Sequence, residues 1–381
     1  MTEFRLRAWA SIDTQALRKN LSIVHQLCPD ASVIPVIKAN AYGHGMQAVA
    51  AVFSSTSMPV QALAVATMME AAYLREQSCE LPLLVLNGFT AADELTFCLE
   101  NRIAPVLHCD YQVELLTQQL DKGLPAGRHQ FWLKFNSGMN RLGMRHEACA
   151  QAYRTLRRCK DLDLVLMSHL AWADEPDSAA ARQFSGRQLA VFEALRAELA
   201  AEQEAPVRCS VAASSGICSL PESRLQIVRP GVMLYGSSPL SNQSAAELGL
   251  LPVMTLSARL LAINTVAAGE HIGYGATFRC EQETRVGVVS IGYGDGYPRA
   301  VGSGTPVLVK ASGGVQRSRL LGRVSMDLIT IDLSDIAGVR VGDEVTLWGE
   351  GLPVDEIARA AGTIAYELLC KVTQRIPRYY L

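Results

Sequence analysis

Apolar residues in the first 240 positions follow two spacings that alternate along the chain. Continuous runs of apolar, often β-branched residues, such as 31–35, are typical of buried parallel strands. Between the runs, apolar positions recur every three or four residues, as at Leu17 and Leu21, and predict amphipathic helices. Asp13 provides an N-cap for the first of these helices. Further strand-like runs lie at 62–66, 82–86, 104–108, 131–135, 164–169, 208–212 and 226–229.

This alternation predicts an α/β fold for the first part of the chain. Strand–helix units of this length build a parallel sheet whose faces are covered by helices. About eight such units would close into a (β/α)8, TIM-like barrel. A doubly wound open sheet is the alternative that the pattern alone leaves open.

After about Pro239 the pattern changes and helical spacings nearly vanish. Glycine pairs and Gly-Asp turns separate short alternating segments, which predicts a mainly antiparallel β structure interrupted by one helix near 354–359. The clearest strand-like segments lie at 253–260, 285–291 and 306–310.

The change of pattern predicts two domains. We assign residues 1–240 to the barrel domain and residues 241–381 to the C-terminal β domain, joined through a polar linker at 237–249. The alternating segment 4–12 opens the first domain, with packing against the second domain as an option. A chain of 381 residues is long enough to bury two cores.

Composition narrows the class of protein. Hydrophobic residues make up 49% and charged residues 19%, which is typical of a globular chain. The net charge of −2, without a dense basic run, argues against nucleic acid as a partner. No apolar run is long enough to span a bilayer, and the N-terminus lacks a signal-peptide core, so we expect a cytoplasmic protein. None of the 10 cysteines forms a C-x-x-C pair, and we expect reduced thiols and no metal site.

Lys38 is the first candidate for chemistry. It follows the apolar run 31–37, and a charged amine is costly to hold at the end of a core strand. Burial lowers a lysine pKa, and a neutral amine can attack a carbonyl such as the aldehyde of pyridoxal phosphate (PLP), forming a Schiff base. The structural alternative is a lysine that extends from the strand end into solvent.

Other polar residues also follow predicted strands. Catalytic groups of barrels lie at the carboxyl ends of strands, so these residues are expected to meet. Taken singly, His169 could be a hydrogen-bonded core histidine, and Arg141 or Arg229 could form surface ion pairs. Small residues and serines around Ser214 and Gly231 would let backbone N–H groups approach a phosphate. The strand-end residues are Lys38, Tyr42, Lys134, Arg141, His169, Ser214, Arg229, Gly231 and Val232.

Segment 38–45, KANAYGHG, resembles the PLP-lysine motif of bacterial alanine racemases. The resemblance recurs in the family's order at RPGVMLYG, HIGYGATF, IGYGDGYPR, GRVSMD and TIAYE, and it spans nearly the whole chain. It implies a fold-type III PLP enzyme with a (β/α)8 barrel followed by a β domain. It also implies a homodimer that interconverts L-alanine and D-alanine, with PLP attached to Lys38.

The resemblance implies roles around the cofactor. Ser214, with Gly231 and Val232, would bind the phosphate, and Tyr42 and Tyr366 would lie on the same side. Ala213 stands where the family often has Asn, which removes one polar contact.

Arg229 would face the pyridine nitrogen. Because arginine keeps its proton, the nitrogen would stay unprotonated, which weakens the ring as an electron sink and limits side reactions.

Tyr274, in HIGYGATF, resembles the second catalytic base of the family. Tyrosine has a pKa near 10 and needs help to act as a base, which a His169–Arg229 relay would provide. The structural alternative is an aromatic turn in a β domain.

The remaining segments imply contacts with the substrate. The Met326 N–H and Arg141 would bind the substrate carboxylate, although Ser325 stands where some members have Cys. Tyr293 and Arg299 would line the approach to the site, with Asp327 as a supporting residue.

Lys134 matches a lysine that is carbamylated in many racemases. The carbamate would be an anion that holds Arg141, whereas an unmodified Lys134 would repel it. Asn136 replaces the family's usual Asp, which leaves the modification open.

Three alternatives to alanine racemisation remain at this point. One is a racemase for another small amino acid, a second is a fold-type III decarboxylase, and the third is a non-catalytic PLP carrier. The carrier class lacks a β domain, and no decarboxylase motif is present. Tyr293 and Tyr366 leave little room, which favours a small amino acid. The residues do not distinguish D-alanine supply for peptidoglycan from D-alanine catabolism.

Overall fold

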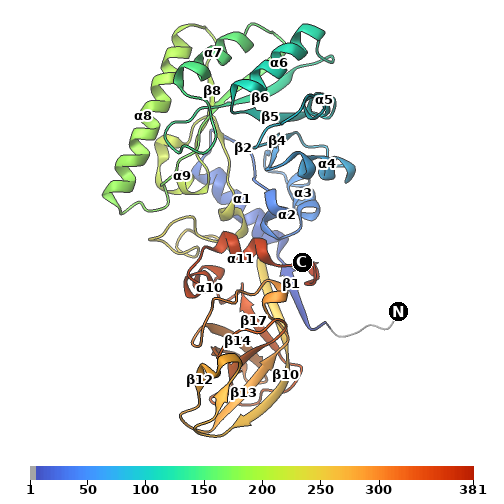
Figure 1. Cartoon of the computed structure of the whole chain (residues 1–381), viewed down its shortest axis with the longest axis vertical. Coiled ribbons are helices and arrows are strands. Elements are labelled where there is room, and N and C mark those ends of the chain that lie inside the picture. Colours follow the sequence, from blue (N-terminus) through green and yellow to red (C-terminus); the bar gives the residue numbers. More distant parts are fainter. Residues whose placement is uncertain (1–5) are drawn as a thin grey trace.

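The computed structural model describes residues 6–381 as two stacked domains (Figure 1). Residues 4 and 5 of the expected first strand lie outside the described part, and β1 covers Ala8–Ile12. The upper domain in Figure 1 holds the parallel strands and most helices, and the lower domain is mainly β structure.

Eight parallel strands form a closed ring in the first domain. Six of them, β3 to β8, pair in sequence order, and β2 pairs with β9. A bridge between Val36 and Ala64 links β2 to β3, and one between Ala213 and Arg229 links β8 to β9. The ring confirms the barrel and excludes the open sheet. Its strands are β2 (Ser32–Val33), β3 (Leu63–Val65), β4 (Leu83–Val85), β5 (Ile103–Leu107), β6 (His129–Lys134), β7 (Leu162–Met167), β8 (Arg208–Ser210) and β9 (Ile227–Val228).

Helices surround this ring, and local sequence explains where several begin. The Asp13 carboxylate accepts the N–H groups of Gln15 and Ala16, as expected for an N-cap. Thr67 and Glu70 form a capping box at the start of α4. The helices are α1 (Thr14–Leu27), α2 (Lys38–Tyr42), α3 (Met46–Ser54), α4 (Met68–Glu76), α5 (Ala92–Glu100), α6 (Asp110–Lys122), α7 (His146–Leu156), α8 (Ala179–Ala201) and α9 (Ser214–Ser219).

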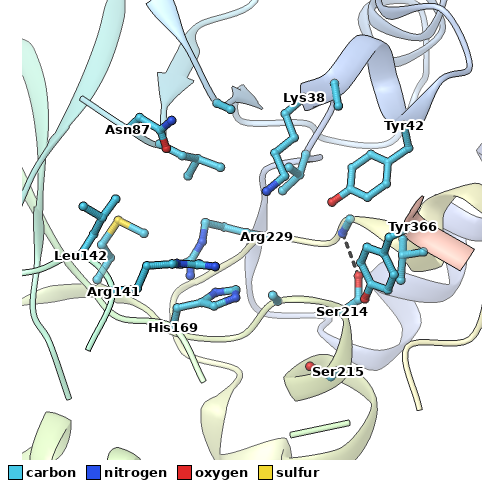
Figure 2. Close-up of a pocket in the computed structure, with 18 of the residues that line it drawn as sticks. Lys38, Tyr42, Asn87, Arg141, Leu142, His169, Ser214, Ser215, Arg229 and Tyr366 are labelled. Atoms are coloured by element: carbon cyan, nitrogen blue, oxygen red, sulfur yellow. Dashed lines mark hydrogen bonds between the residues drawn. The ribbon is translucent and has the colours of Figure 1, made fainter. Parts of the chain in front are cut away.

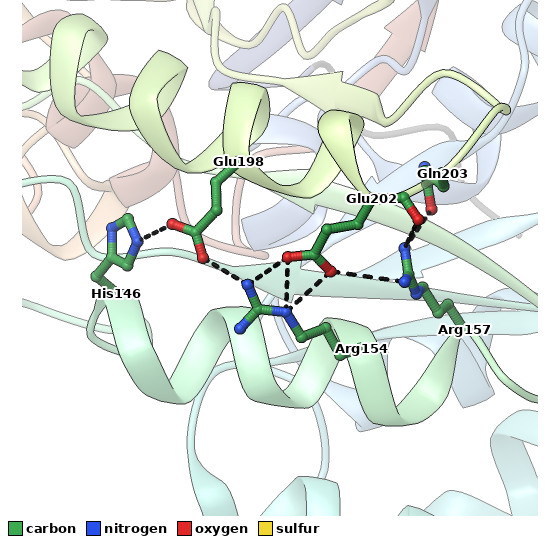
Figure 3. Close-up of polar contacts among 6 residues, drawn as sticks. All are labelled: His146, Arg154, Arg157, Glu198, Glu202 and Gln203. Atoms are coloured by element: carbon green, nitrogen blue, oxygen red, sulfur yellow. Dashed lines mark hydrogen bonds and ion pairs between the residues drawn. The ribbon is translucent and has the colours of Figure 1, made fainter.

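Two outer helices, α7 and α8, are joined by a row of charged side chains (Figure 3). Glu198 accepts from His146 and Arg154, both at 2.6 Å, and Arg154 also donates to Glu202. Each member of this row is about one third exposed, so water screens the charges and the stabilisation is small.

The second domain is a closed antiparallel barrel of its own. Strand β10 is long enough to pair with β17 near its start and β13 near its end, and β13-β16-β15-β14-β17 completes the ring. Strand β1 adds to β10 from outside, so the first strand packs with the second domain. The strands are β10 (Met254–Val266), β11 (His271–Ile272), β12 (Phe278–Arg279), β13 (Thr284–Val289), β14 (Pro306–Ala311), β15 (Gly314–Leu321), β16 (Ile329–Asp332), β17 (Glu344–Trp348) and β18 (Arg378–Tyr380).

Two helices, rather than the single one expected, follow β17. The expected helix is α10 (Val354–Ala360), and the second is α11 (Ala365–Lys371). Helix α11 packs against α2, where Gly43 has φ +79° and a Cβ would lie 2.0 Å from the Leu369 carbonyl oxygen. This contact brings a helix of the second domain to the mouth of the barrel.

Candidate active site

A cavity of about 610 Å³ opens at the carboxyl ends of the barrel strands. Figure 2 shows Lys38, Arg141, Arg229 and His169 around one space, with Tyr42, Tyr366 and Ser214 beside it. None of the described residues that line the cavity is Asp or Glu. The sequence-predicted residues that line it are Lys38, Tyr42, Lys134, Arg141, His169, Ser214, Arg229, Gly231, Val232 and Tyr366.

The backbone turns sharply directly after Lys38. Ala39, Asn40, Ala41 and Tyr42 all have φ between 50° and 54°, so α2 is a left-handed turn despite its helical hydrogen bonds. The left-handed conformation costs roughly 1–2 kcal/mol per L-residue. Gly43 and Gly45 end the turn with φ of +79° and +98°. The two glycines of the motif therefore supply the positive φ angles with which the chain leaves this turn next to Lys38.

Four basic side chains line the cavity, namely those of Lys38, Lys134, Arg141 and Arg229. Burial lowers the pKa of Lys38, and Arg141 lowers it further, while Glu70 and Cys370 act in the opposite direction. Burial lowers the pKa of Lys134 to about 8, assisted by Arg229, Arg141 and Lys38. Lys134 is only 8% exposed. Such a group of cations without a carboxylate suits anionic ligands.

Arg229 is fixed by the ends of the neighbouring strands. It is 3% exposed, donates to the carbonyl oxygens of Ser168 at 2.7 Å and Val211 at 3.2 Å, and contacts the Ser210 hydroxyl. Burial lowers its pKa to about 10, so the guanidinium keeps its charge at neutral pH.

His169 is neutral beside this group. Burial, followed by the charge of Arg229, lowers the pKa of His169 to about 3. No hydrogen bond between His169 and Arg229 is found within residues 6–381, so the relay that joins them stays a prediction.

A small-residue rim faces Tyr42 and Tyr366. The Ser214 hydroxyl oxygen accepts the Gly231 N–H at 2.8 Å, the dashed line in Figure 2, and it donates to none of the described residues. A Cβ at Gly231 would lie 2.6 Å from the Tyr42 hydroxyl, so glycine keeps this rim open. Helix α9 and the short helix η2 (Val232–Tyr235) both begin at this rim. Their first N–H groups have no hydrogen-bond partner within the helix.

Five of the predicted site residues lie elsewhere, on the β domain. Tyr274 is 71% exposed and Met326 is 53% exposed, and neither lines the cavity of its own chain. Tyr293, Arg299 and Asp327 are also exposed. One chain therefore does not bring Lys38 and Tyr274 together.

Four of these residues nevertheless belong to adjoining loops, and Arg299 follows Tyr293 by six residues in the chain. The N–H groups of Tyr293 and Gly294, in η4 (Tyr293–Asp295), donate to the Ser325 and Met326 carbonyl oxygens at 3.1 and 2.8 Å. Arg323 lies against η3 (Tyr274–Ala276), since a Cβ at Gly275 would be 3.2 Å from its guanidinium.

Arg375 holds these loops to the rest of the β domain. It donates to Asp327 at 2.6 Å and lies 3.5 Å from the fully buried Asp295, which also pairs with Arg7. We call Tyr274, Tyr293, Arg299, Met326 and Asp327 the β-domain cluster.

Sequence reasoning missed two polar residues of the cavity, Asn87 and Cys370. Asn87 follows β4 by two residues, so the strand-end rule that found Lys134 also applies to it. Cys370 lies four residues after Tyr366, one turn further along α11. The missing signal was the helix itself, because α11 was not expected.

The described part of the chain lacks two features of other protein classes. Within residues 6–381, no three His, Cys, Asp or Glu side chains lie close enough to hold a metal ion. In the same residues, no helix has the length and apolar character needed to cross a membrane.

Comparison with known proteins identifies the family. The family model for the alanine racemase N-terminal domain matches residues 12–239, and the model for the alanine racemase C-terminal domain matches residues 253–380. The chain belongs to the alanine racemase family. The resemblance noted from the motifs is thereby confirmed. The carrier class, which lacks the β domain, is set aside.

Individual alanine racemases match over almost the full chain. The alanine racemase of Vibrio cholerae is 41% identical over 376 residues, which is 98% of each protein. The crystal structure of the biosynthetic alanine racemase from Pseudomonas aeruginosa is 40% identical, covers 99% of this chain and 100% of its own, and has a TM-score of 0.89. The alanine racemase of Acinetobacter baumannii is 36% identical over the same shares, with a TM-score of 0.88. Alanine racemases are isomerases, and the family depends on PLP.

Proposed function

We propose that this protein is a homodimeric, PLP-dependent alanine racemase that uses Lys38 and Tyr274 as two bases. The observation that carries the proposal is the cavity with four cations, a serine–glycine rim and no carboxylate. A phosphate group and an amino-acid carboxylate are the anions that this family's reaction brings together. Both fit the donors that are present, so the residues suit PLP.

Individual side chains fit parts of the cofactor. The Lys38 amine would hold PLP, and its lowered pKa favours the neutral form that does so. Ser214, Tyr42 and Tyr366, with the N–H groups near Gly231 and Val232, would bind the phosphate. Arg229, fixed by three strand-end oxygens, would donate to the pyridine nitrogen. When bound, PLP withdraws electrons from the substrate and so acidifies its Cα–H.

The chain's own residues then move the proton. Lys38 would take the α-proton from one face of the substrate, and Tyr274 of the partner subunit would return a proton to the other face. Arg141 and the Met326 N–H would hold the substrate carboxylate. Because Tyr274 and Met326 are exposed and do not line the cavity of their own chain, a second copy is the simplest source of these groups.

A carbamate on Lys134 is part of the proposal. A pKa near 8 leaves a useful fraction of neutral amine at physiological pH, and a neutral amine adds to CO2 with loss of one proton. The product replaces one of four cations with an anion, which would hold Arg141 in place. Asn136 cannot supply that negative charge.

We propose a cytoplasmic location, because all ten cysteines are unpaired, as is usual in a reducing compartment. D-alanine from the reaction would serve peptidoglycan synthesis, or the enzyme would catabolise D-alanine.

Two measurements test the proposed function. Circular dichroism should show each alanine enantiomer converting to a racemic mixture, with serine and lysine as comparison substrates. Borohydride reduction followed by peptide mapping should place PLP on Lys38. PLP on Lys134 or Lys310 would overturn the assignment of Lys38. Faster racemisation of serine or lysine than of alanine would mean that alanine is not the preferred substrate.

A further inference from the structure

The left-handed turn after Lys38 needs an external support. Four consecutive non-glycine residues adopt a conformation that L-residues disfavour, and such segments persist only where surrounding contacts hold them. The first residue of the turn, Ala39, is directly bonded to Lys38. The contact that fixes Ala39 therefore also affects the direction of the Lys38 side chain.

Glu70 makes that contact from helix α4. One of its carboxylate oxygens accepts the Ala39 N–H at 2.6 Å. The other accepts the N–H groups of Ala66 at 2.8 Å and Thr67 at 3.1 Å. A single side chain thus ties the turn after Lys38 to the segment that joins β3 to α4.

The other side-chain contacts of the turn lie further from Lys38, while backbone hydrogen bonds such as that from the Ala41 N–H to the Ile37 carbonyl oxygen at 2.8 Å run within the turn. The Asn40 side-chain oxygen accepts the Met46 N–H at 2.8 Å. The His44 ring nitrogen Nδ1 lies 3.0 Å and 2.8 Å from the carbonyl oxygens of Ala41 and Tyr42. These contacts hold the end of the turn, whereas Glu70 holds its beginning.

We propose that Glu70 is a positioning residue that anchors Ala39 and thereby sets the direction in which the Lys38 amine points into the cavity. The inference rests on the proposed function, because the direction of Lys38 matters only if this residue holds PLP.

Glu70 also affects the charge of Lys38. Burial and Arg141 lower the pKa of Lys38, whereas Glu70 and Cys370 raise it. Lys134, on the facing strand β6, adds a further positive charge to the cavity. Removing the Glu70 charge should therefore shift the pH dependence of PLP attachment to lower pH. Displacement of Lys38 alone would weaken attachment without that shift.

Glu70→Gln separates the two contacts of this side chain. The amide has one acceptor oxygen, which satisfies two donors if it faces Ala66 and Thr67 but only one if it faces Ala39. We expect it to face Ala66 and Thr67, so that the NH2 group opposes the Ala39 N–H and breaks that contact. Glu70→Asp is the second variant, because it keeps the charge but is too short to bridge both sites.

Two control variants isolate this effect from helix stability. Thr67→Ala removes the Thr67 hydroxyl, which accepts the Glu70 N–H at 3.3 Å in the capping box. It leaves the contact between Glu70 and Ala39 intact. Glu76→Gln makes the same chemical change as Glu70→Gln at the exposed end of α4.

The experiment measures PLP binding by the purified full-length holoprotein after dialysis against stepped PLP concentrations, across a pH series. Borohydride mapping and thermal midpoints accompany it. We expect Glu70→Gln and Glu70→Asp to weaken PLP binding about tenfold or more, which corresponds to loss of one charged hydrogen bond. Only Glu70→Gln should shift the pH midpoint downward. Thr67→Ala should lower the thermal midpoint without either effect, and Glu76→Gln should match the wild type.

Three outcomes would count against the inference. PLP binding by both Glu70 variants equal to that of Thr67→Ala would mean that Glu70 only caps α4. An unshifted pH midpoint in Glu70→Gln would mean that Glu70 does not affect the charge of Lys38. PLP absent from Lys38 in the wild type would instead overturn the proposed function, and the inference with it.

Discussion

The barrel cavity and the β-domain cluster differ in how much of their surroundings one chain supplies. In the cavity, Lys134 and Arg229 are 8% and 3% exposed, and strand ends fix their positions. In the cluster, Tyr274 and Met326 are 71% and 53% exposed. The cavity is a shaped, buried site, whereas the cluster is a set of ordered loops on a surface.

This difference indicates which further groups would complete the barrel cavity, the first half of the site, and the β-domain cluster, the second half. Buried cations without a carboxylate are costly, and an anionic cofactor or a carbamate would offset their repulsion. Exposed aromatic and methionine side chains on ordered loops are typical of surfaces that meet a partner. In our proposal, PLP completes the first half and a second copy of the chain completes the second.

Tyr274→Ala tests the cluster with the largest expected effect. A base on one face of the substrate cannot reach the proton on the other, because proton transfer requires hydrogen-bond distance. By the family resemblance, Lys38 serves D-alanine and Tyr274 serves L-alanine. The variant should slow α-proton exchange of L-alanine in deuterated water by about 10²–10⁴-fold, far more than that of D-alanine. PLP should remain bound, and equal slowing of both enantiomers would contradict the two-base proposal.

Lys134→Ala tests whether the cavity requires an anion at this position. If a carbamate holds Arg141, the variant should lose about 10–100-fold in racemisation. Added chloride or a small carboxylate should restore part of it. An ordinary ammonium group on native Lys134, in crystals grown with ample bicarbonate, would contradict the carbamate.

Arg229→Glu tests the cofactor side of the cavity. A glutamate can pair with a protonated pyridine nitrogen and so strengthen the electron sink. Racemisation should fall by about tenfold or more, while side transamination to pyruvate should rise. Unchanged partitioning between the two reactions would mean that Arg229 does not face the ring.

A smaller effect is expected in the charged row between α7 and α8, away from both halves of the site. Hydrogen bonds from His146 and then Arg154 lower the pKa of Glu198. A carboxylate with a lowered pKa stabilises the fold above its unfolded pKa, and that stabilisation is lost as the pH falls through the folded value.

Glu198→Gln should therefore lower the thermal midpoint at neutral pH by less than about 2 °C. The difference from wild type should vanish in acid. Glu204→Gln, at an exposed glutamate with no ion pair in the described chain, is the matched control. A large loss, or one that persists at low pH, would mean that the row stabilises the fold in another way.

The same two regions show what the sequence could predict. Strand-end position was sufficient to gather Lys38, Lys134, His169 and Arg229, because parallel strands of a barrel all end on one face. Pattern could not separate a closed ring from an open sheet, since closure depends on the pairing of β2 with β9.

The family motifs, rather than periodicity, pointed to the β-domain cluster. Turns such as HIGYGATF carry little pattern of their own. Helix α11 was missed because its seven residues follow a short turn after α10, and Cys370 was missed with it. The left-handed turn after Lys38 is also absent from the pattern, because Ala39 and Ala41 are ordinary helix formers.

In our proposal, one active site combines the barrel of one chain with the β domain of another. Mixing Lys38→Ala chains with Tyr274→Phe chains tests it most directly. Each variant alone should be inactive, and each mixed dimer should have one intact site. With full exchange, about a quarter of wild-type racemisation should return, because half the dimers are mixed and one of their two sites is intact. Demonstrated subunit exchange without any return of activity would contradict the claim.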